Sequence, residues 1–133
     1  MEETEFKQLI GKTITRINKG IDRIEFVCKN ENSIFKNAPL TYVMYHCQDC
    51  CEYVSIEDIN GDLDDLINTP ILQAEERTSN ENPEGFEKDY QDSFTWTFYH
   101  LATIKGYVTI RWYGESNGYY SESVDFVEEE YKQ

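Results

Sequence analysis

The chain has 133 residues, of which 39% are hydrophobic and 14% are aromatic, and its net charge is −14. This length supports a single domain (1–133) with a real core, and the negative charge speaks against a nucleic-acid-binding surface because phosphates would be repelled. The acidic, polar start does not resemble a secretory leader, and no apolar run is long enough to cross a membrane. We therefore expect a cytoplasmic protein whose thiols stay reduced.

The first half of the chain predicts one helix followed by strands. Residues 2–10 place Phe6, Leu9 and Ile10 at helical spacing, with acidic residues in the first turn and Gly11 as a stop. The apolar content of the next segments is typical of β-strands. These strands are predicted at 14–18, 21–28, 41–47 and 53–59.

The second half predicts a short helix, an acidic loop and a hairpin. The short helix covers 62–67 and ends before Pro70, and the loop 78–92 has the composition of a mobile connection. Two later segments alternate large apolar with other residues on either side of a Lys-Gly turn, which indicates a β-hairpin. The later strands are predicted at 71–76, 93–103, 107–113 and 119–127. The expected fold class is α+β: a mostly antiparallel sheet with an N-terminal helix and one or two short helices.

The densest group of possible metal ligands lies in residues 46–52 (His-Cys-Gln-Asp-Cys-Cys-Glu), which hold three of the four cysteines. A Cys-x-x-Cys spacing lets a tight turn present two thiolates to one ion, and zinc takes four N or S ligands. The sequence therefore predicts a structural zinc site formed by His46, Cys47, Cys50 and Cys51. A local turn presents about three of these ligands comfortably. Other sources for the fourth ligand are Cys28, Asp49, Glu52, His100 and water.

Other states of the thiols stay open. Buried free thiols are one alternative, because cysteine packs well as a small hydrophobic side chain. A disulfide between Cys28 and one member of the cluster is another, since adjacent cysteines do not easily bridge each other. A cysteine nucleophile beside His46 fits less well, because three thiols in five residues suit a metal better than catalysis. We therefore do not expect this protein to be an enzyme.

Acidic residues are concentrated in the middle of the chain. Residues 49–92 hold fourteen acidic and two basic residues, a balance of −12, whereas residues 1–48 have a balance of +1. Such a surface can serve solubility alone, or it can bind a partner whose own surface is basic. The residues predicted to bind that partner are Glu57, Asp58, Asp62, Asp64 and Asp65.

Two strings, HxxxCC at 46–51 and RWYGxSNGYY at 111–120, resemble a family of small uncharacterised phage proteins, and the likeness covers about 42–127. The size, charge and cysteine cluster also resemble type II-A anti-CRISPR proteins, small acidic phage inhibitors of Cas9, one of which binds zinc. This resemblance implies a zinc-stabilised phage protein in the host bacterial cytoplasm. It would bind a Cas9-type effector through its acidic surface, hinder DNA loading or cleavage, and make no direct contact with nucleic acid.

Two further functions are alternatives. Arg111, Trp112 and Tyr119-Tyr120 could form a stacking pocket for a nucleotide signal in host defence. A metal-dependent enzyme would instead need an open coordination position on the zinc ion.

Overall fold

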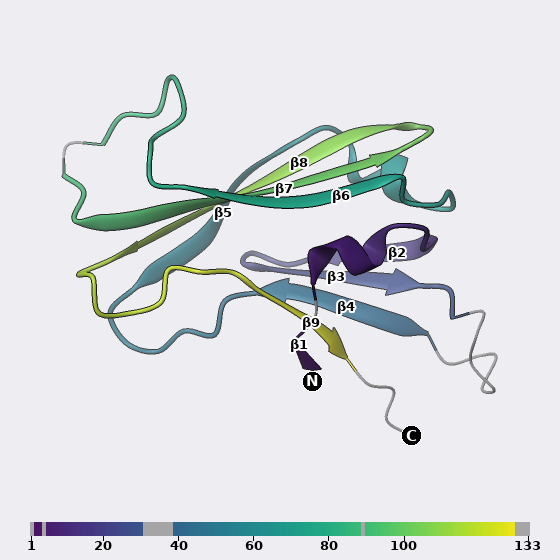
Figure 1. Cartoon of the computed structure of the whole chain (residues 1–133), viewed down its shortest axis with the longest axis horizontal. Helices are drawn as coiled ribbons and strands as arrows, with labels where there is room; N and C mark the ends of the chain where they lie inside the picture. The colour runs from purple at the N-terminus through teal and green to yellow at the C-terminus, as the bar shows by residue number, and fades with distance from the viewer. Residues whose placement is uncertain (1, 4, 31–38, 89, 130–133) are drawn as a thin grey trace.

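Two antiparallel β-sheets lie one above the other (Figure 1). Both sheets contribute side chains to a single buried apolar cluster. The structure is a computed structural model, and it describes residues 2–3, 5–30, 39–88 and 90–129. Two sheets pack in this way because each has an apolar face that must be covered. Within the described ranges, no helix is both long and apolar enough to cross a membrane.

The first sheet has five strands and joins the two ends of the described chain. Its strands are β1 (Glu2–Glu3), β2 (Ile14–Lys19), β3 (Arg23–Cys28), β4 (Leu40–Tyr45) and β9 (Asp125–Glu129). They lie in the order β1-β9-β4-β3-β2, so the C-terminal strand is inserted between the first strand and β4. Val43 lies opposite Val127 in this pairing, and both side chains are buried.

The second sheet has four strands in the order β5-β8-β7-β6. Its strands are β5 (Tyr53–Asn60), β6 (Gln73–Ser79), β7 (Ser93–Thr103) and β8 (Gly106–Ser116). The predicted hairpin is confirmed: β7 and β8 pair along eleven residues each, with Thr103 opposite Gly106 at the turn. β5 and β6 form the two edges of this sheet.

The core lies between the sheets and is rich in aromatic residues. Trp112 of β8 is fully buried, and its indole N–H donates to the sulfur atom of Met44 in β4, 3.1 Å away. Tyr99 of β7 packs its ring 4.6 Å from that of Phe6, which in turn contacts Phe126 of β9 at 5.1 Å. These contacts connect the two sheets through large side chains, which contribute most per residue to apolar burial.

The expected α+β class is wrong, because the described residues contain no α-helix. The two expected helices are one-turn 3-10 helices, η1 (Phe6–Leu9) and η2 (Leu63–Leu66), and Glu2–Glu3 form a strand. Both 3-10 helices have their apolar pair at positions i and i+3, which matches three residues per turn. Gly11, with φ of 86°, ends the first helical segment before an α-helix could offset its nucleation cost.

Candidate functional site

The loop that contains the first of the two sequence strings contacts the segment that follows the second string. Residues 46–52 connect β4 of the first sheet to β5 of the second, and residues 117–124 lead from β8 to β9. Nδ1 of His46 lies 2.7 Å from the carbonyl oxygen of Ser123, which joins the two loops. We take this junction as the candidate functional site.

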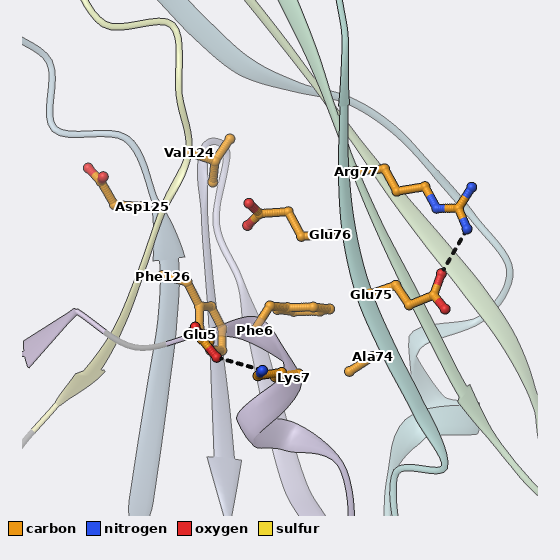
Figure 2. A pocket seen from close by; sticks show the side chains of 10 residues that line it. All are labelled: Glu5, Phe6, Lys7, Ala74, Glu75, Glu76, Arg77, Val124, Asp125 and Phe126. Carbon is orange, nitrogen blue, oxygen red and sulfur yellow. Dashed lines mark hydrogen bonds and ion pairs between the residues drawn. The ribbon is translucent and has the colours of Figure 1, made fainter.

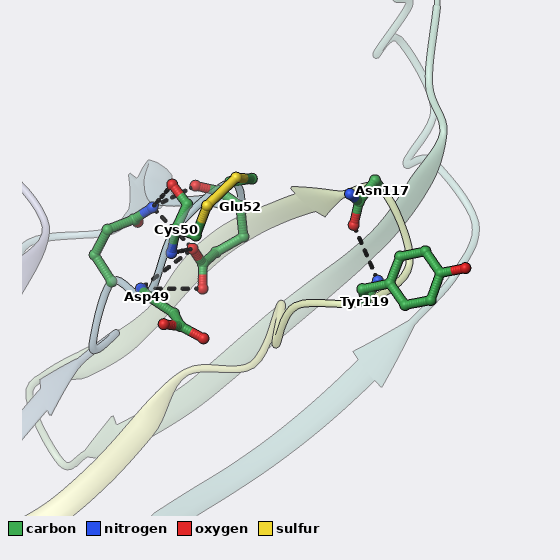
Figure 3. The surroundings of a disulfide bond; sticks show 7 residues. Asp49, Cys50, Glu52, Asn117 and Tyr119 are labelled. Atoms are coloured by element: carbon green, nitrogen blue, oxygen red, sulfur yellow. Dashed lines mark hydrogen bonds between the residues drawn. A yellow bond between two sulfur atoms is a disulfide. The ribbon is translucent and has the colours of Figure 1, made fainter.

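Glu52 is the centre of the 46–52 loop, and it is buried, with 5% of its surface exposed. The backbone N–H groups of Cys50 and Asp49 donate to its Oε1 atom at 2.9 and 3.2 Å (Figure 3). The side-chain amide of Gln48 donates to the same oxygen at 2.8 Å, and Nε2 of His46 lies 3.2 Å from Oε2. One carboxylate therefore organises the whole turn.

These contacts determine the protonation of the site. Burial by itself raises the pKa of Glu52, but hydrogen bonds from its own amide, from Cys50, from His46 and from Asp49 outweigh that effect. The pKa of this carboxyl group therefore lies below its ordinary value, and the group stays ionised at neutral pH. Both ring nitrogens of His46 lie within hydrogen-bond distance of an oxygen, the carbonyl of Ser123 and the carboxylate of Glu52.

The cysteines are in three different environments. Cys50 and Cys51 form a disulfide with each other (Figure 3), so the pairing is not the one with Cys28 considered from the sequence. Cys47 is a free, exposed thiol. Cys28 is a free thiol buried at the end of β3, and burial raises its pKa to about 11. Its thiolate is therefore scarce at neutral pH, which suits a packing role.

The four predicted zinc ligands do not converge in this arrangement. The nitrogens of His46 are engaged by Ser123 and Glu52, two of the sulfur atoms are bonded to each other, and Cys47 points to solvent. Within the described part of the chain, no three His, Cys, Asp or Glu side chains are grouped so that they could hold a metal ion. The site as described does not fit zinc, and zinc binding stays a prediction.

Among the residues predicted to bind a partner, Asp58 already has an intramolecular role. Nε of Arg111 on β8 donates to Oδ1 of Asp58 at 2.6 Å, and Nη2 contacts Oδ2. This hydrogen bonding raises the pKa of Arg111. The guanidinium also lies 5.7 Å from the ring centre of Trp96, on the outer face of the sheet. Asp58 therefore helps to fix Arg111 on this face.

Two more of the predicted residues support η2. Oδ1 of Asp62 accepts a hydrogen bond from the backbone N–H of Asp64 at 2.9 Å, which caps this short helix. The carboxylate of Asp65 packs so closely on Gly106 that a Cβ atom at that glycine would overlap it. Glu57 and Asp64 are left as exposed side chains that a partner can contact directly.

The residues of the alternative nucleotide pocket are not brought together. Arg111 and Trp112 are neighbours on a strand, so their side chains lie on opposite faces of the sheet. Trp112 is buried in the core, whereas 89% of Tyr119 is exposed in the loop after β8. No stacking pocket is formed from these side chains.

Sequence reasoning missed an aromatic layer on the outer face of the second sheet. Trp96 is fully buried there, its indole N–H donates to Oδ1 of Asn82 at 3.1 Å, and Phe86 meets its ring edge-on at 4.9 Å. The acidic loop 78–92, expected to be mobile, therefore packs across this face. The sequence did contain a signal for this layer. β7 has large apolar residues on both of its faces, so the face that points away from the core also had to be covered by another part of the chain.

Comparison of the chain with curated proteins and with solved structures gave no match. Residues 7–126 match a family model with the description Domain of unknown function (DUF7448). The match includes the 46–52 loop and nearly all of both sheets. Because it covers far more than half of the sequence, the chain belongs to this family, DUF7448.

Proposed function

We propose that this protein acts by binding a basic surface of a Cas9-type effector, so that DNA loading or cleavage is hindered. The phage anti-CRISPR proteins that its sequence resembles supply the identity of the partner. The site of action would be the cytoplasm of the infected bacterium. The observation that most supports this proposal is the exposed, largely unpaired negative charge of residues 49–92.

The described acidic residues of this segment mostly face solvent without a basic neighbour. In the part of the chain that the structure describes, Glu75 is the only exposed acidic residue of this segment in an ion pair, with Arg77. The exposed acidic side chains are Asp49, Glu57, Asp62, Asp64, Glu75, Glu76, Glu81, Glu84, Glu87 and Asp92. Such charges repel one another and destabilise the fold, and a basic partner surface would remove that repulsion.

We infer binding in preference to catalysis from the roles of the perturbed groups. The carboxylate of Glu52 is saturated with hydrogen bonds that organise its own loop. Cys28 is buried, and its raised pKa disfavours the nucleophilic thiolate. Neither group is free to act on a substrate.

The test is cleavage of a matched DNA target by Cas9 and its guide RNA, with the protein added before or after the DNA. Inhibition only when the protein is added first supports blocked loading. Inhibition should also weaken as salt rises, because attraction between exposed charges is screened over about 8–10 Å at physiological ionic strength. Unchanged cleavage at large excess over several type II-A effectors would refute the proposal.

The variant pair Glu57→Lys and Asp64→Lys tests the predicted surface without touching the η2 cap or Arg111. It should weaken inhibition at least tenfold. Its control is Glu84→Lys with Glu87→Lys, which makes the same charge change in the loop at the other end of β6. Equal loss in both pairs would mean that net charge, and not this surface, is responsible.

A further inference from the structure

A cleft of about 750 Å³ opens between β6 of the second sheet and the start of β9 in the first (Figure 2). Its apolar lining comes from Phe6 of η1, Ala74 of β6, and Val124 and Phe126 at β9. Charged side chains from the same three elements form the rest of the lining. The cleft is thus apolar inside and charged at its margin, as are many protein–protein interfaces.

The charges at the margin are not balanced. Lys7 pairs with Glu5 at 3.1 Å and Arg77 pairs with Glu75 at 3.4 Å, as Figure 2 shows. The two remaining carboxylates, Glu76 and Asp125, form no ion pair with any residue that the structure describes. The cleft therefore has two carboxylates available for a cationic ligand.

A buried hydroxyl group lies next to these carboxylates. Tyr99 is directly opposite Glu76 in the pairing of β7 with β6, so both side chains are on the core-facing side of the sheet. The hydroxyl of Tyr99 is fully buried and has no hydrogen-bond partner within the described residues. Burial, followed by the charge and the hydrogen-bonding capacity of the nearby Glu76 carboxylate and then by the charge of Asp125, raises the pKa of Tyr99, so the hydroxyl stays protonated as a donor.

The backbone next to the cleft is a free sheet edge. β6 pairs with β7 on one side, and among the described residues no strand pairs with its other side. An edge strand presents unpaired N–H and C=O groups to which another extended segment can add. The seven residues of β6 offer enough length for a short peptide strand.

We infer that this cleft binds an extended basic segment of a partner protein, which adds as a strand to the free edge of β6. Alternate side chains of such a segment point to the same side. The side chains that face the cleft would be lysine or arginine, whose charged ends reach Glu76 and Asp125 while their methylene stems cover Phe6 and Phe126. A second copy of this chain is a poor occupant, because each copy has a charge of −14. The surface is separate from Glu57 and Asp64 and does not depend on the partner proposed above.

The experiment is a fluorescence anisotropy titration with a labelled nonapeptide of alternating lysine and valine. The matched peptide of alternating glutamate and valine should not bind. Glu76→Lys and Asp125→Lys should each weaken binding of the lysine peptide at least tenfold. Glu84→Lys, with the same charge change on the loop 78–92, and the Glu57→Lys, Asp64→Lys pair should change it less than twofold. Circular dichroism establishes that each variant is folded, and Glu76→Gln replaces Glu76→Lys if the latter is not.

Strand addition is tested with two versions of the lysine peptide that are N-methylated at either odd or even positions. Only one set of N–H groups can face β6, so one version should lose binding and the other should keep it. Hydrogen exchange of residues 73–79 should slow when the peptide binds. The inference is overturned if the lysine peptide does not bind, if Glu84→Lys weakens it as much as Glu76→Lys, or if both methylated peptides bind equally well.

Discussion

The carboxylate of Glu52 lies 3.2 Å from Nε2 of His46, and both side chains are shielded from solvent. The other nitrogen of His46 contacts the carbonyl oxygen of Ser123, so the pair ties the β4–β5 loop to the segment before β9. Each of these two segments connects a strand of one sheet to a strand of the other. The His46–Glu52 pair therefore fixes how the two sheets are connected at this end of the molecule.

We predict that Glu52 makes stability depend on pH in the acid range. Its pKa is lower in the folded chain than the ordinary glutamate value of about 4.3, so its stabilising effect is present above that value. The effect is lost as the pH falls through the lower pKa of the folded state. Thermal unfolding followed by circular dichroism should show that Glu52→Gln melts at a lower temperature than the wild type near pH 7. This difference should shrink as the pH is lowered below the ordinary glutamate value and through the lower pKa of the folded state.

Glu57→Gln is the control, because Glu57 is exposed on the adjoining strand. Its melting temperature should follow that of the wild type at every pH. A Glu52→Gln protein that melts like the wild type at pH 7 would contradict the role of this carboxylate.

The cysteines should react in a fixed order. Cys47 is exposed and should react first with a disulfide reagent at neutral pH, whereas buried Cys28, with its pKa raised to about 11, should react only after unfolding. Cys50 and Cys51 should be modified only after reduction. Mass spectrometry after timed alkylation identifies each site.

The same experiment separates the disulfide from the zinc prediction. About one zinc ion per chain by elemental analysis, with Cys47, Cys50 and Cys51 becoming reactive on chelation without a reductant, would support zinc and contradict the disulfide. A chelator would then also lower the melting temperature, because metal binding is linked to folding.

The strands were the more predictable part of the fold. β7 and β8 alternate large side chains around a Lys-Gly turn, a pattern that few other structures accommodate, and the hairpin was predicted within three residues at each end. The prediction of α-helices failed because the apolar spacing of a short segment such as Phe6–Leu9 fits a 3-10 helix and an α-helix equally well. Packing against Tyr99, a contact made across the core, selects between them.

The location of the candidate site in the sequence could be predicted, but the contacts among its side chains could not. Composition alone singled out residues 46–52, since soft ligands and carboxylates rarely gather so densely. The role of Glu52 depends on backbone amides that converge only when the loop closes. The partner of His46 is Ser123, 77 residues away, and no local pattern could indicate it.

Asn82 should anchor the loop 78–92 to the second sheet. Its Oδ1 atom accepts from the indole of Trp96 at 3.1 Å and from the amide of Gln91 at 3.0 Å, so Asn82→Ala leaves the Trp96 N–H without this acceptor. We expect a loss of about 1–2 kcal/mol in unfolding free energy, measured by urea denaturation. Faster hydrogen exchange in the loop should accompany it. Asn80→Ala, an exposed change two residues earlier, should leave both quantities as in the wild type.

Gly114 should be the least replaceable glycine of the RWYGxSNGYY string. The backbone of Glu122 lies directly on it, and a Cβ atom at position 114 would overlap the carbonyl oxygen of Glu122. That segment is held in place because the Glu122 carboxylate accepts hydrogen bonds from Thr95 at 2.8 Å and Ser116 at 2.5 Å. Gly114→Ala should therefore lower the unfolding free energy by about 2–3 kcal/mol, the upper part of the range for overpacking.

Gly118→Ala is the matched comparison, because Gly118 has φ of 97° but open space around its Cα atom. It should lose about 1 kcal/mol through backbone strain alone. Equilibrium unfolding of both variants measures the difference. Equal losses of unfolding free energy in the two variants would mean that the loop before β9 does not lie against β8. Because Ser123 follows Glu122 directly, that result would also speak against the contact between His46 and Ser123. A larger loss at Gly114, together with a loss of protection at His46 in hydrogen exchange, is the result that the packing of these loops requires.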